Sequence, residues 1–313
     1  MEKILSIIIV SFNSGRILEK CLRSIFASDL DRSTYEVVVV DNASTDSTVA
    51  MVHTMFPEIV LLENKLNLGF AAANNQAMLI AKGKYILLLN PDTEVAPDAL
   101  RLMLEGIQQY PRAGAVGPRL VSPDGTYQFV SARKLPTPFL TIFRLLGLDR
   151  MSPGRVAYFS AFQDATSNGE VEAISGACTL VPREILETVG LLDDTLPMGG
   201  EDIDWYRRIL DHDYKIYYLA KPQVVHIGGT SRVLDVVRTD IEAFKAHYSY
   251  LAKHFGTHAA LIYRFLLGIT MVFRALFWTG CAAVRPASPL KFIEKTRASL
   301  KLFLWSLSFW QTR

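Results

Sequence analysis

The triplet Asn90-Pro91-Asp92 follows a short apolar run, Tyr85–Leu89, in the segment KGKYILLLNPDTEV. Proline fixes its own φ and disfavours the helical region for the residue before it, so the chain leaves the run at a set angle and presents Asp92 beyond it. A hard divalent cation binds carboxylate, phosphate and water oxygens, so one carboxylate can suffice when a substrate supplies a diphosphate. Asn90 could then contribute a carbonyl oxygen or hold a water. The alternative is a turn in which Asp92 caps a helix near residues 97–110.

A second acidic cluster, Glu201-Asp202-x-Asp204, follows two glycines in the segment PMGGEDIDWYRRIL. Acidic residues in a first helical turn interact favourably with the helix dipole, which is one sufficient explanation for them. The other explanation is chemical, because a carboxylate of this kind could remove a proton from an acceptor hydroxyl. Trp205, which stands beside the acids, could stack on a sugar ring.

Polar residues follow other apolar runs. Asp41 ends the run YEVVVVD, where its carboxylate could accept hydrogen bonds from a pyrimidine N–H and a sugar hydroxyl, or could cap the next helix. Gly69, in Asn67-Leu68-Gly69, would let the backbone approach a ligand before a helix N-terminus that attracts phosphate, although a capped turn is the ordinary alternative. His226, in VVHIGG, could complete a metal shell as a neutral imidazole or be purely structural.

The first hundred residues alternate between β-branched runs and amphipathic segments. Strands are expected at residues 4–12, 35–41, 58–63 and 85–90, and helices at residues 16–28, 42–56 and 69–83. Continuous apolar strands separated by helices predict a mostly parallel sheet that is covered on both faces. In such sheets ligands bind beyond the carboxyl ends of the strands. The polar residues gathered at those ends are Asn13, Asp41, residues 64–67 and residues 90–92.

The middle of the chain is less regular. A hairpin is expected around Asp124-Gly125, and residues 131–170 are expected to be irregular, as in a lid or an acceptor loop. A strand and a helix follow in VEAISGACTLVPREIL, a helix follows the two glycines before Glu201, and two short strands follow in KIYYLAKPQVVHIGG.

The C-terminal part differs in composition. Residues 259–284 are apolar over about the length that spans a bilayer, but Arg264 and Arg274 interrupt them, which argues against a plain lipid-facing span. A basic, tryptophan-containing tail is typical of a segment that lies on or dips into an anionic membrane surface. The alternative is a helical hairpin that packs on the rest of the protein or on a second subunit. The expected domains are residues 1–240 and a helical, membrane-associating region at residues 241–313.

The bulk composition excludes some classes of protein. The 313 residues are 50% hydrophobic and carry a net charge of +2, so the composition supports a large core and does not suggest nucleic-acid binding. The three cysteines, Cys21, Cys178 and Cys281, are far apart, so neither a disulfide framework nor a thiolate zinc site is expected, and a reducing compartment fits best. The N-terminal run is expected to be the first buried strand rather than a signal peptide.

Seven segments together resemble the family 2 inverting glycosyltransferases, and in particular their bacterial rhamnosyltransferase-like branch. They are SIIIVSFNS, YEVVVVDNASTDST, NLGFAAANNQA, YILLLNPDTEV, ISGACTLVPRE, MGGEDIDWYRRI and VVHIGGTS, within residues 4–232. Members of that branch often carry Asn-Pro-Asp where the wider family has Asp-x-Asp. The resemblance implies a GT-A fold, which is a Rossmann-like α/β sheet with flanking helices, here followed by C-terminal amphipathic or hydrophobic helices.

The resemblance also implies roles for individual residues. Asp202 would be the catalytic base, Glu201 and Trp205 would shape the acceptor site, and Asp92 with His226 would bind Mg²⁺ or Mn²⁺. The residues implied to contact the nucleotide sugar are Ser11, Asn13, Asp41, Asn67, Gly69, Asn75, Asn90 and Asp92. Asn74 stands where many relatives carry an arginine, and Asn90 replaces a carboxylate, so the chain departs from the family pattern at a phosphate contact and at a metal ligand.

The implied activity is a metal-assisted single displacement that moves a sugar from a nucleotide-sugar donor to an acceptor. Membership of the branch favours dTDP-rhamnose as the donor, with UDP- and GDP-sugars as alternatives. The basic aromatic tail suggests a polyprenyl-linked or cell-envelope glycan acceptor at the cytoplasmic face of the bacterial inner membrane, with the protein peripheral or anchored through its C-terminal helices. The oligomeric state is left open.

Three competing functions fit the sequence less well. A sugar-nucleotide nucleotidyltransferase would carry a glycine-rich segment with a Lys/Arg pair after the first strand, where this chain has only Gly15 and Arg16. A processive polysaccharide synthase would usually have several spans and a Gln/Arg-x-x-Arg-Trp motif, and DWYRRIL lacks that order. A non-catalytic membrane-associated protein that binds sugar nucleotides would tolerate the loss of Asp92 and Asp202.

Overall fold

The computed structural model describes residues 3–145, 166–228, 236–284 and 289–308. The chain divides into two compact units, Met1–Leu135 with Phe159–Val233, and Pro136–Tyr158 with Leu234–Arg313. The first is called the catalytic unit below and the second the helical unit. The expected boundary after residue 240 stays a prediction, since the helical unit also takes in a segment from the middle of the chain.

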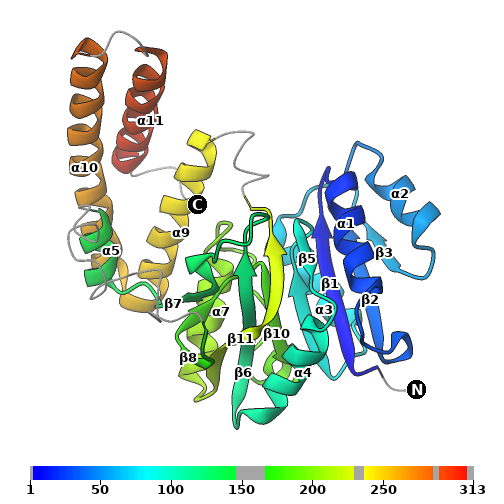
Figure 1. Cartoon of the computed structure of the whole chain (residues 1–313). Coiled ribbons are helices and arrows are strands. Elements are labelled where there is room, and N and C mark those ends of the chain that lie inside the picture. The colour runs from blue at the N-terminus through cyan, green and yellow to red at the C-terminus, as the bar shows by residue number, and fades with distance from the viewer. Residues whose placement is uncertain (1–2, 146–165, 229–235, 285–288, 309–313) are drawn as a thin grey trace. The chain divides into compact units, whose positions relative to one another are not determined.

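A nine-stranded sheet forms the centre of the catalytic unit, in the order β3-β2-β1-β4-β10-β6-β11-β5, with β8 paired to β11 (Figure 1). Its strands are β1 Leu5–Ser11, β2 Tyr35–Asp41, β3 Val60–Glu63, β4 Tyr85–Leu89, β5 Thr93–Val95, β6 Ala113–Val121, β8 Gly169–Val171, β10 Cys178–Pro182 and β11 Lys215–His226. A separate two-stranded ladder joins β7 Ala132–Arg133 to β9 Ala173–Ile174.

The pairing of the strands is mixed. β1 is parallel to both β2 and β4, and β2 is parallel to β3, as the alternating pattern predicts. β10 then inserts antiparallel to β4 and β6, and β5 pairs antiparallel with β11. The expected α/β fold is therefore confirmed, with a parallel N-terminal half and a mixed remainder.

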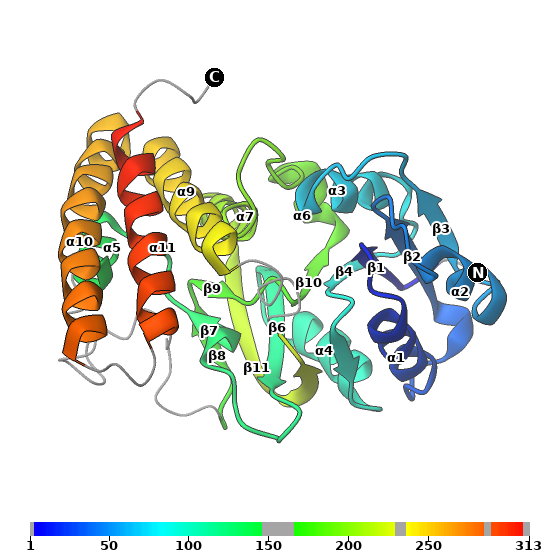
Figure 2. The same ribbon diagram turned by 90° about the horizontal axis from the view of Figure 1, so that it is seen from above.

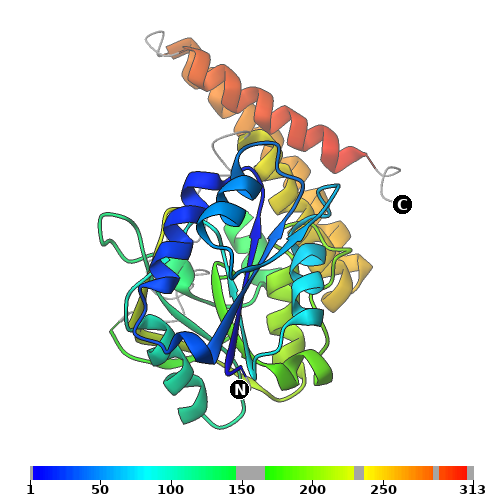
Figure 3. The ribbon, with the colours of Figure 1, turned by 90° about the vertical axis from the view of Figure 1, so that its right-hand side faces the viewer.

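Helices cover both faces of this sheet. They are α1 Gly15–Phe26, α2 Thr48–Met55, α3 Phe70–Ile80, α4 Ala99–Gln109, α6 Arg183–Thr188 and α7 Glu201–Asp211, with short 3₁₀ turns η1 Arg32–Thr34 and η2 Phe129–Ser131. α1 and α4 lie on one face, and α3, α6 and α7 lie on the other (Figure 2, Figure 3). The central strands are thus apolar on both sides, and each fully buried Leu or Ile side chain stabilises the fold by about 1.5–3 kcal/mol.

Gly83 shows why the connection into β4 needs a glycine. A Cβ atom at this position would lie 2.4 Å from the backbone nitrogen of Ser6, a distance that side chains do not tolerate. The Ser6 hydroxyl accepts the Gly83 amide at 2.7 Å. The sequence correctly predicts a helix ending near this glycine, although α3 itself ends at Ile80 and the glycine serves the close approach to β1.

The middle of the chain is more regular than expected. The hairpin at Asp124-Gly125 is confirmed, with Gly125 at φ 82° and the Thr126 carbonyl accepting from the Ser122 amide at 2.8 Å. Pro138–Leu145 forms helix α5, and the remainder of the expected irregular segment, residues 146–165, lies outside the described residues. The two strands expected after residue 215 are one strand, β11, with a register shift between Leu219 and Gln223.

The helical unit consists of α5, α9 Val236–Phe255, α10 Thr257–Val284 and α11 Pro289–Leu307. α10 and α11 pack side by side, and α9 and α5 pack against α10. Leu267 and Met271 of α10 and Leu302 of α11 form the buried centre of this unit.

Candidate active site

Asp92 and His226 face one another at one end of the catalytic sheet. The antiparallel ladder between β5 and β11 pairs Thr93 with His226, and the Ile227 amide donates to the Asp92 carbonyl at 3.0 Å. This ladder holds the His226 Nε2 atom 3.6 Å from Asp92 Oδ1, with both side chains largely buried. Two residues that are far apart in the sequence are thus held as a pair by main-chain hydrogen bonds.

Gln128, which sequence analysis did not single out, fixes the orientation of His226. Its amide nitrogen donates to the His226 carbonyl at 2.7 Å, and its oxygen lies 2.9 Å from His226 Nδ1. A carbonyl can only accept, so the amide nitrogen must face it and the amide oxygen must face Nδ1. In the neutral ring Nδ1 therefore carries the proton and Nε2 carries the lone pair that points toward Asp92.

The protonation state of His226 agrees with this arrangement. Burial lowers the pKa of His226 below its ordinary value, and the negative charge of Asp92 offsets that effect only in part. A neutral imidazole with a directed lone pair is a ligand for a divalent cation.

Asn90 adds an oxygen to the same turn. Its Oδ1 atom is buried and has no hydrogen-bond partner, which is unusual for a buried polar atom and is a feature of sites that bind a ligand or ion. Carboxylate, amide oxygen and imidazole nitrogen are donors that suit Mg²⁺ or Mn²⁺. Among the residues that the structure describes, no group of three or more His, Cys, Asp or Glu side chains forms a closed metal site. A cation held here would thus depend on further oxygen ligands, such as those of a diphosphate.

Asp41 lies at the end of β2 with one carboxylate oxygen occupied. Oδ2 accepts the Ser44 amide at 2.8 Å, while Oδ1 is buried and has no partner. Only 2% of the residue is exposed, so this oxygen would be costly to leave without a donor. A ring N–H or a sugar hydroxyl would satisfy it, which agrees with the predicted nucleotide contact.

Ser11 and Asn13 shape the adjoining loops. The Asn13 Oδ1 atom accepts a hydrogen bond from the Thr45 backbone amide at 2.8 Å. The backbone amide of Asn13 donates to Ser44 Oγ at 2.8 Å. The hydroxyls of Ser11 and Ser14 lie 2.6 Å apart. Asn13 has a positive φ of 49°, a conformation that asparagine tolerates better than most residues. Asn13 thus ties the end of β1 to the loop after β2, while Ser11 is bonded within the loop that follows β1.

The loop before α3 is organised by Asn42, which sequence analysis did not single out. Its amide nitrogen donates to Asn67 Oδ1 at 2.9 Å, and its oxygen accepts the Leu68 amide at 3.0 Å. Asn67 Oδ1 also accepts the Gly69 amide at 3.0 Å. Gly69 is needed for its φ of 86°, since a Cβ there would meet no other atom. No side chain caps α3 at Gly69, so its first amides remain available to an anion.

Asn75 has a structural partner. Its amide nitrogen donates to the Leu192 carbonyl at 2.8 Å, and its oxygen accepts the Leu192 amide at 3.1 Å. Neighbouring Asn74 is buried and donates to the Phe70 carbonyl at 2.9 Å. The structure therefore gives both asparagines a role in holding the chain, and the nucleotide contact inferred for Asn75 stays a prediction.

Asp202 lies at the start of α7 and is held by Arg133. The Arg133 Nη2 atom donates to Asp202 Oδ2 at 3.0 Å and to the Ile174 carbonyl at 2.7 Å. Both side chains of this ion pair are about one-sixth exposed. A Cβ on Gly176 would lie only 3.1 Å from Asp202 Oδ2, so a glycine leaves room for the carboxylate.

One segment links Asp202 to the Asn-Pro-Asp turn. The Asn90 amide donates to the Ala177 carbonyl at 2.9 Å, while the adjoining Gly176 is in contact with Asp202. Asp202 and Asn90 therefore both adjoin the segment Gly176–Ala177. This segment brings the start of α7 next to the Asn-Pro-Asp turn.

The other residues of the acidic cluster are buried. Burial raises the pKa of Glu201 to about 8, and the charge of Asp202 raises it further in the same direction, so Glu201 is mainly protonated at neutral pH. Asp204 is fully buried and pairs with Arg208 at 2.8 Å. Trp205 is 1% exposed and donates its indole N–H to the Gly190 carbonyl at 2.8 Å. In this conformation the Trp205 ring has no free face on which a sugar could stack, so its predicted acceptor contact has no geometric support.

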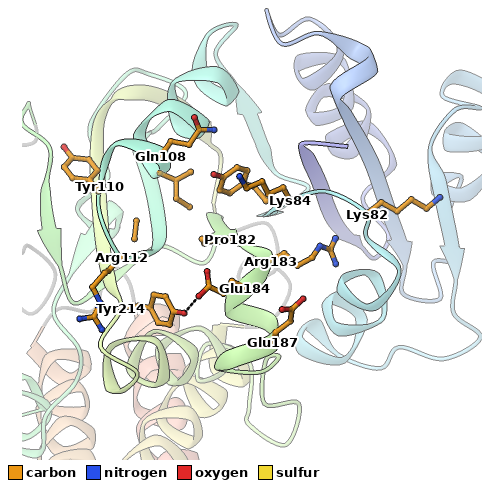
Figure 4. A pocket seen from close by; sticks show the side chains of 13 residues that line it. Lys82, Lys84, Gln108, Tyr110, Arg112, Pro182, Arg183, Glu184, Glu187 and Tyr214 are labelled. Carbon is orange, nitrogen blue, oxygen red and sulfur yellow. Dashed lines mark hydrogen bonds between the residues drawn. The ribbon is translucent and has the colours of Figure 1, made fainter. Parts of the chain in front are cut away.

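A pocket of about 540 Å³ lies at the opposite ends of the same strands, where β4 begins and β10 ends (Figure 4). It is lined by Lys82, Lys84, Tyr85, Ile107, Gln108, Tyr110, Arg112, Ala113, Pro182, Arg183, Glu184, Glu187 and Tyr214. Tyr214 donates a hydrogen bond of 2.7 Å to Glu184 across it. No predicted site residue is among these lining residues, so the pocket is separate from the candidate active site.

An α/β sheet that gathers acidic, amide and imidazole side chains at the carboxyl ends of its strands has the architecture of an α/β enzyme. A model of the family Glycosyl transferase family 2 matches residues 6–190, which is more than half of the 313-residue chain. The chain therefore belongs to this family and is a family 2 glycosyltransferase.

Individual relatives agree with the family. The chain is 28% identical over 270 residues to N-acetylglucosaminyl-diphospho-decaprenol L-rhamnosyltransferase of Mycobacterium tuberculosis, in an alignment that covers 82% of this chain and 87% of the relative. The expected resemblance to the rhamnosyltransferase-like branch is thus confirmed.

Solved structures show the same fold. The mannosyltransferase PcManGT from Pyrobaculum calidifontis, in complex with GDP-Man and Mn²⁺, superposes with a TM-score of 0.60 at 19% identity, covering 98% of this chain and 89% of that one. GalNAc-T7 with UDP, GalNAc and Mn²⁺ superposes with a TM-score of 0.54 at 18% identity, covering 72% and 44%. These similarities confirm the GT-A fold.

Proposed function

We propose that this glycosyltransferase moves one sugar, with inversion, from a nucleotide-sugar donor to a hydroxyl of a lipid-linked acceptor, with Asp202 as the base. The observation that carries the proposal is that Asp202 and Asn90 both adjoin the short segment Gly176–Ala177. A single displacement requires a base and a diphosphate site near the same sugar ring, and this shared segment supports that arrangement.

The proposed step forms one bond to the anomeric carbon and breaks another. Asp202 takes the proton of the acceptor hydroxyl while the hydroxyl oxygen forms a bond to the anomeric carbon. The bond from that carbon to the diphosphate oxygen breaks on the opposite face, and its electron pair leaves with the nucleoside diphosphate. Arg133 holds Asp202 in place before the acceptor arrives, through its 3.0 Å hydrogen bond.

Asp92 and His226 are the residues that would hold Mg²⁺ or Mn²⁺, with Asn90 Oδ1 as a further oxygen donor. A bound divalent cation neutralises the charge that develops on a leaving diphosphate. The support for this assignment is the directed lone pair of His226, the adjacent Asp92 carboxylate and the unpartnered Asn90 oxygen.

For the donor we propose dTDP-rhamnose, because the relative that shares 28% identity is a rhamnosyltransferase. The free oxygen of Asp41 suits the ring N–H of a pyrimidine or a ribose hydroxyl. The acceptor is inferred from the same relative, whose name gives an N-acetylglucosaminyl-diphospho-decaprenol substrate. Such an acceptor places the reaction at a membrane surface, and we propose the cytoplasmic face of a bacterial inner membrane.

The test is a transfer assay with the full chain in detergent micelles that contain polyprenyl-diphosphate-linked N-acetylglucosamine. dTDP-rhamnose is compared with UDP- and GDP-sugars, with and without Mn²⁺. We expect turnover of dTDP-rhamnose and a loss of about 10²–10⁴-fold with Asp202→Asn, the range for removal of a general base. Asp211→Asn is the matched control, because Asp211 lies on the same helix in an exposed ion pair with Arg207.

Each part of the proposal has its own contrary outcome. Full activity of Asp202→Asn would refute the base assignment. Turnover of a UDP- or GDP-sugar alone would refute the donor, and equal rates after removal of divalent cations would refute the metal assignment.

A further inference from the structure

Helix α10 presents a continuous apolar face to solvent. The large apolar side chains exposed along it are Ile262, Phe265, Ile269, Val272, Phe273, Leu276 and Phe277. Their spacing of three and four residues places them on one side of the helix. The buried residues Ala260, Leu267, Met271 and Ala275 lie on the opposite side. Packing among the described helices of this unit, α5, α9, α10 and α11, therefore leaves this apolar face exposed.

Arg264, which interrupts the apolar sequence of α10, does not interrupt this face. It is 4% exposed and turns inward to the C-terminal end of α11. There its guanidinium donates to the carbonyls of Ser306, Trp305 and Ser308 at 2.9, 2.9 and 2.5 Å. It thereby satisfies carbonyl groups that a helix end leaves without partners. The charge of Arg264 is therefore directed into the hairpin and away from the exposed apolar face.

α10 and α11 form an antiparallel hairpin along most of their lengths. Arg264, near the start of α10, meets the end of α11, and Lys295, near the start of α11, lies 4.0 Å above the ring of Trp278. Between them, a Cβ on Gly268 would lie 2.7 Å from Ser306 Oγ, so the two helices approach closely there. The helices are therefore joined at both ends and in between.

α11 cannot cross a bilayer, because charged residues recur along it. Within its 19 residues it carries Lys291, Glu294, Lys295, Arg297 and Lys301. Charges at the centre of a membrane are costly, and spanning helices rarely carry more than one or two of them. Exposed apolar residues nevertheless line one side of this helix as well, at Ile293, Leu300, Leu304 and Leu307. α11 thus has the composition of a helix that lies in the interface between water and lipid.

α10 is long and apolar enough to cross a membrane by length and composition, with 39% of its most apolar window buried. It cannot do so while it remains packed against α11, because α11 would have to enter the hydrocarbon with it. The sequence from Thr257 to Leu307 is also strongly basic. Its charged residues are Arg264, Arg274, Arg285, Lys291, Lys295, Arg297 and Lys301, opposed only by Glu294.

We propose that α10 and α11 bind the surface of an anionic lipid bilayer as an intact hairpin that lies in the interface and does not cross the membrane. The exposed apolar side chains enter the boundary between headgroups and acyl chains, and the exposed Arg274, Arg297 and Lys301 contact lipid phosphates. This inference does not depend on which sugar the catalytic unit transfers.

Vesicle flotation of the full chain tests binding. We expect binding to phosphatidylglycerol–phosphatidylcholine vesicles, weaker binding at high salt, and little binding to phosphatidylcholine alone. The double variant Phe273→Asp/Phe277→Asp changes two exposed side chains and should weaken binding at least about tenfold, since it removes two large apolar anchors. Leu79→Asp, at an equally exposed position on the catalytic unit, is the matched control and should bind like the wild type. Binding that is unaffected by the double variant would overturn the proposal.

The topology is tested with a cysteine placed between the two helices. Ser288→Cys in a Cys281→Ser background is added to sealed vesicles and treated with a membrane-impermeant maleimide, since Cys21 and Cys178 are buried. Labelling without detergent is expected for a hairpin in the interface. Protection that is lost only on adding detergent would show a spanning arrangement. If vesicle binding is absent and light scattering shows a dimer that the double variant dissociates, the apolar face covers a second copy and the proposal fails.

Discussion

Gln128 makes two hydrogen bonds to one residue, His226, at 2.7 Å to its carbonyl and at 2.9 Å to its ring. The two contacts leave a single arrangement of donor and acceptor, so the lone pair of Nε2 is directed toward Asp92. The ring of the proposed metal ligand His226 is thereby oriented by the side chain of Gln128.

Gln128→Leu should weaken Mn²⁺ binding to the protein saturated with dTDP by about 10–100-fold, the usual cost of losing a side chain that orients a ligand. Titration calorimetry measures this without turnover. Gln108→Leu, an exposed position, is the control and should leave the affinity unchanged. Equal affinities for the Gln128 variant and the wild type would show that the imidazole is held by other means.

Arg133→Met should lower kcat by roughly 10–100-fold, because small displacements of a reacting group have effects of that size. The KM for the donor should change little, since Arg133 contacts Asp202 and the Ile174 carbonyl. Arg133→Lys should restore part of the rate, because a lysine can still reach the carboxylate. A large rise in donor KM with unchanged kcat would instead place Arg133 in the donor site.

Glu201 should make the protein less stable as pH rises. Its pKa is raised from 4.5 to about 8 in the folded state, so over that interval the folded state binds more protons than the unfolded state. The contribution of Glu201 to the free energy of unfolding is therefore greatest below about pH 4.5. It decreases as the pH rises to about 8. The slope is at most about 1.4 kcal/mol per pH unit.

Glu201→Gln mimics the protonated form and should remove this dependence. Urea unfolding of both proteins across the interval should show the variant gaining stability relative to the wild type as pH rises. Parallel curves for the two proteins would mean that Glu201 ionises normally in the folded state.

Asn90→Asp should raise the affinity of the nucleotide-free protein for Mn²⁺ by at least about tenfold. Two unit charges about 4 Å apart attract by about 4 kcal/mol at an effective dielectric constant near 20, so even partial contact has a large effect. The same change should weaken nucleotide binding when no divalent cation is added. If Mn²⁺ binds the variant and the wild type equally, residue 90 does not face the cation.

Much of the catalytic fold could be predicted from the sequence. The four-valine run before Asp41 and the apolar run before Asn90 are buried strands, and their polar ends lie at one edge of the sheet as expected. These predictions succeed because continuous β-branched runs and helix-capping residues are local signals. β10 could not be placed in this way, since nothing local distinguishes a parallel neighbour from an antiparallel one.

The supporting residues of the site could not be predicted from the sequence, for a similar reason. Gln128 and Arg133 follow the Asp124-Gly125 turn, which is predictable from local sequence. Their partners in the site are not, because they lie 98 and 69 residues further along the chain. For Trp205, in contrast, the sequence indicated a contact that the structure does not support. Its position beside the acidic cluster suggested a sugar contact, whereas its indole is bonded inside the core to Gly190. Asn42 could have been found from its place directly after Asp41.

The three-residue ladder between β5 and β11 also sets an order of events during synthesis. β5 leaves the ribosome soon after β4, whereas its partner is the last strand of the sheet, ending at His226. β11 lies between β6 and β5, so in a nascent chain that lacks it β6 is paired only with β10, and β5 and β8 have no partner strand in the sheet. The residues around Asp41 can assemble early, but the pair of Asp92 and His226 forms only when this strand is inserted. Formation of this proposed cation-binding pair therefore marks the completion of the sheet, and a chain truncated before residue 226 would retain the loops after β1 and β2 without the pair.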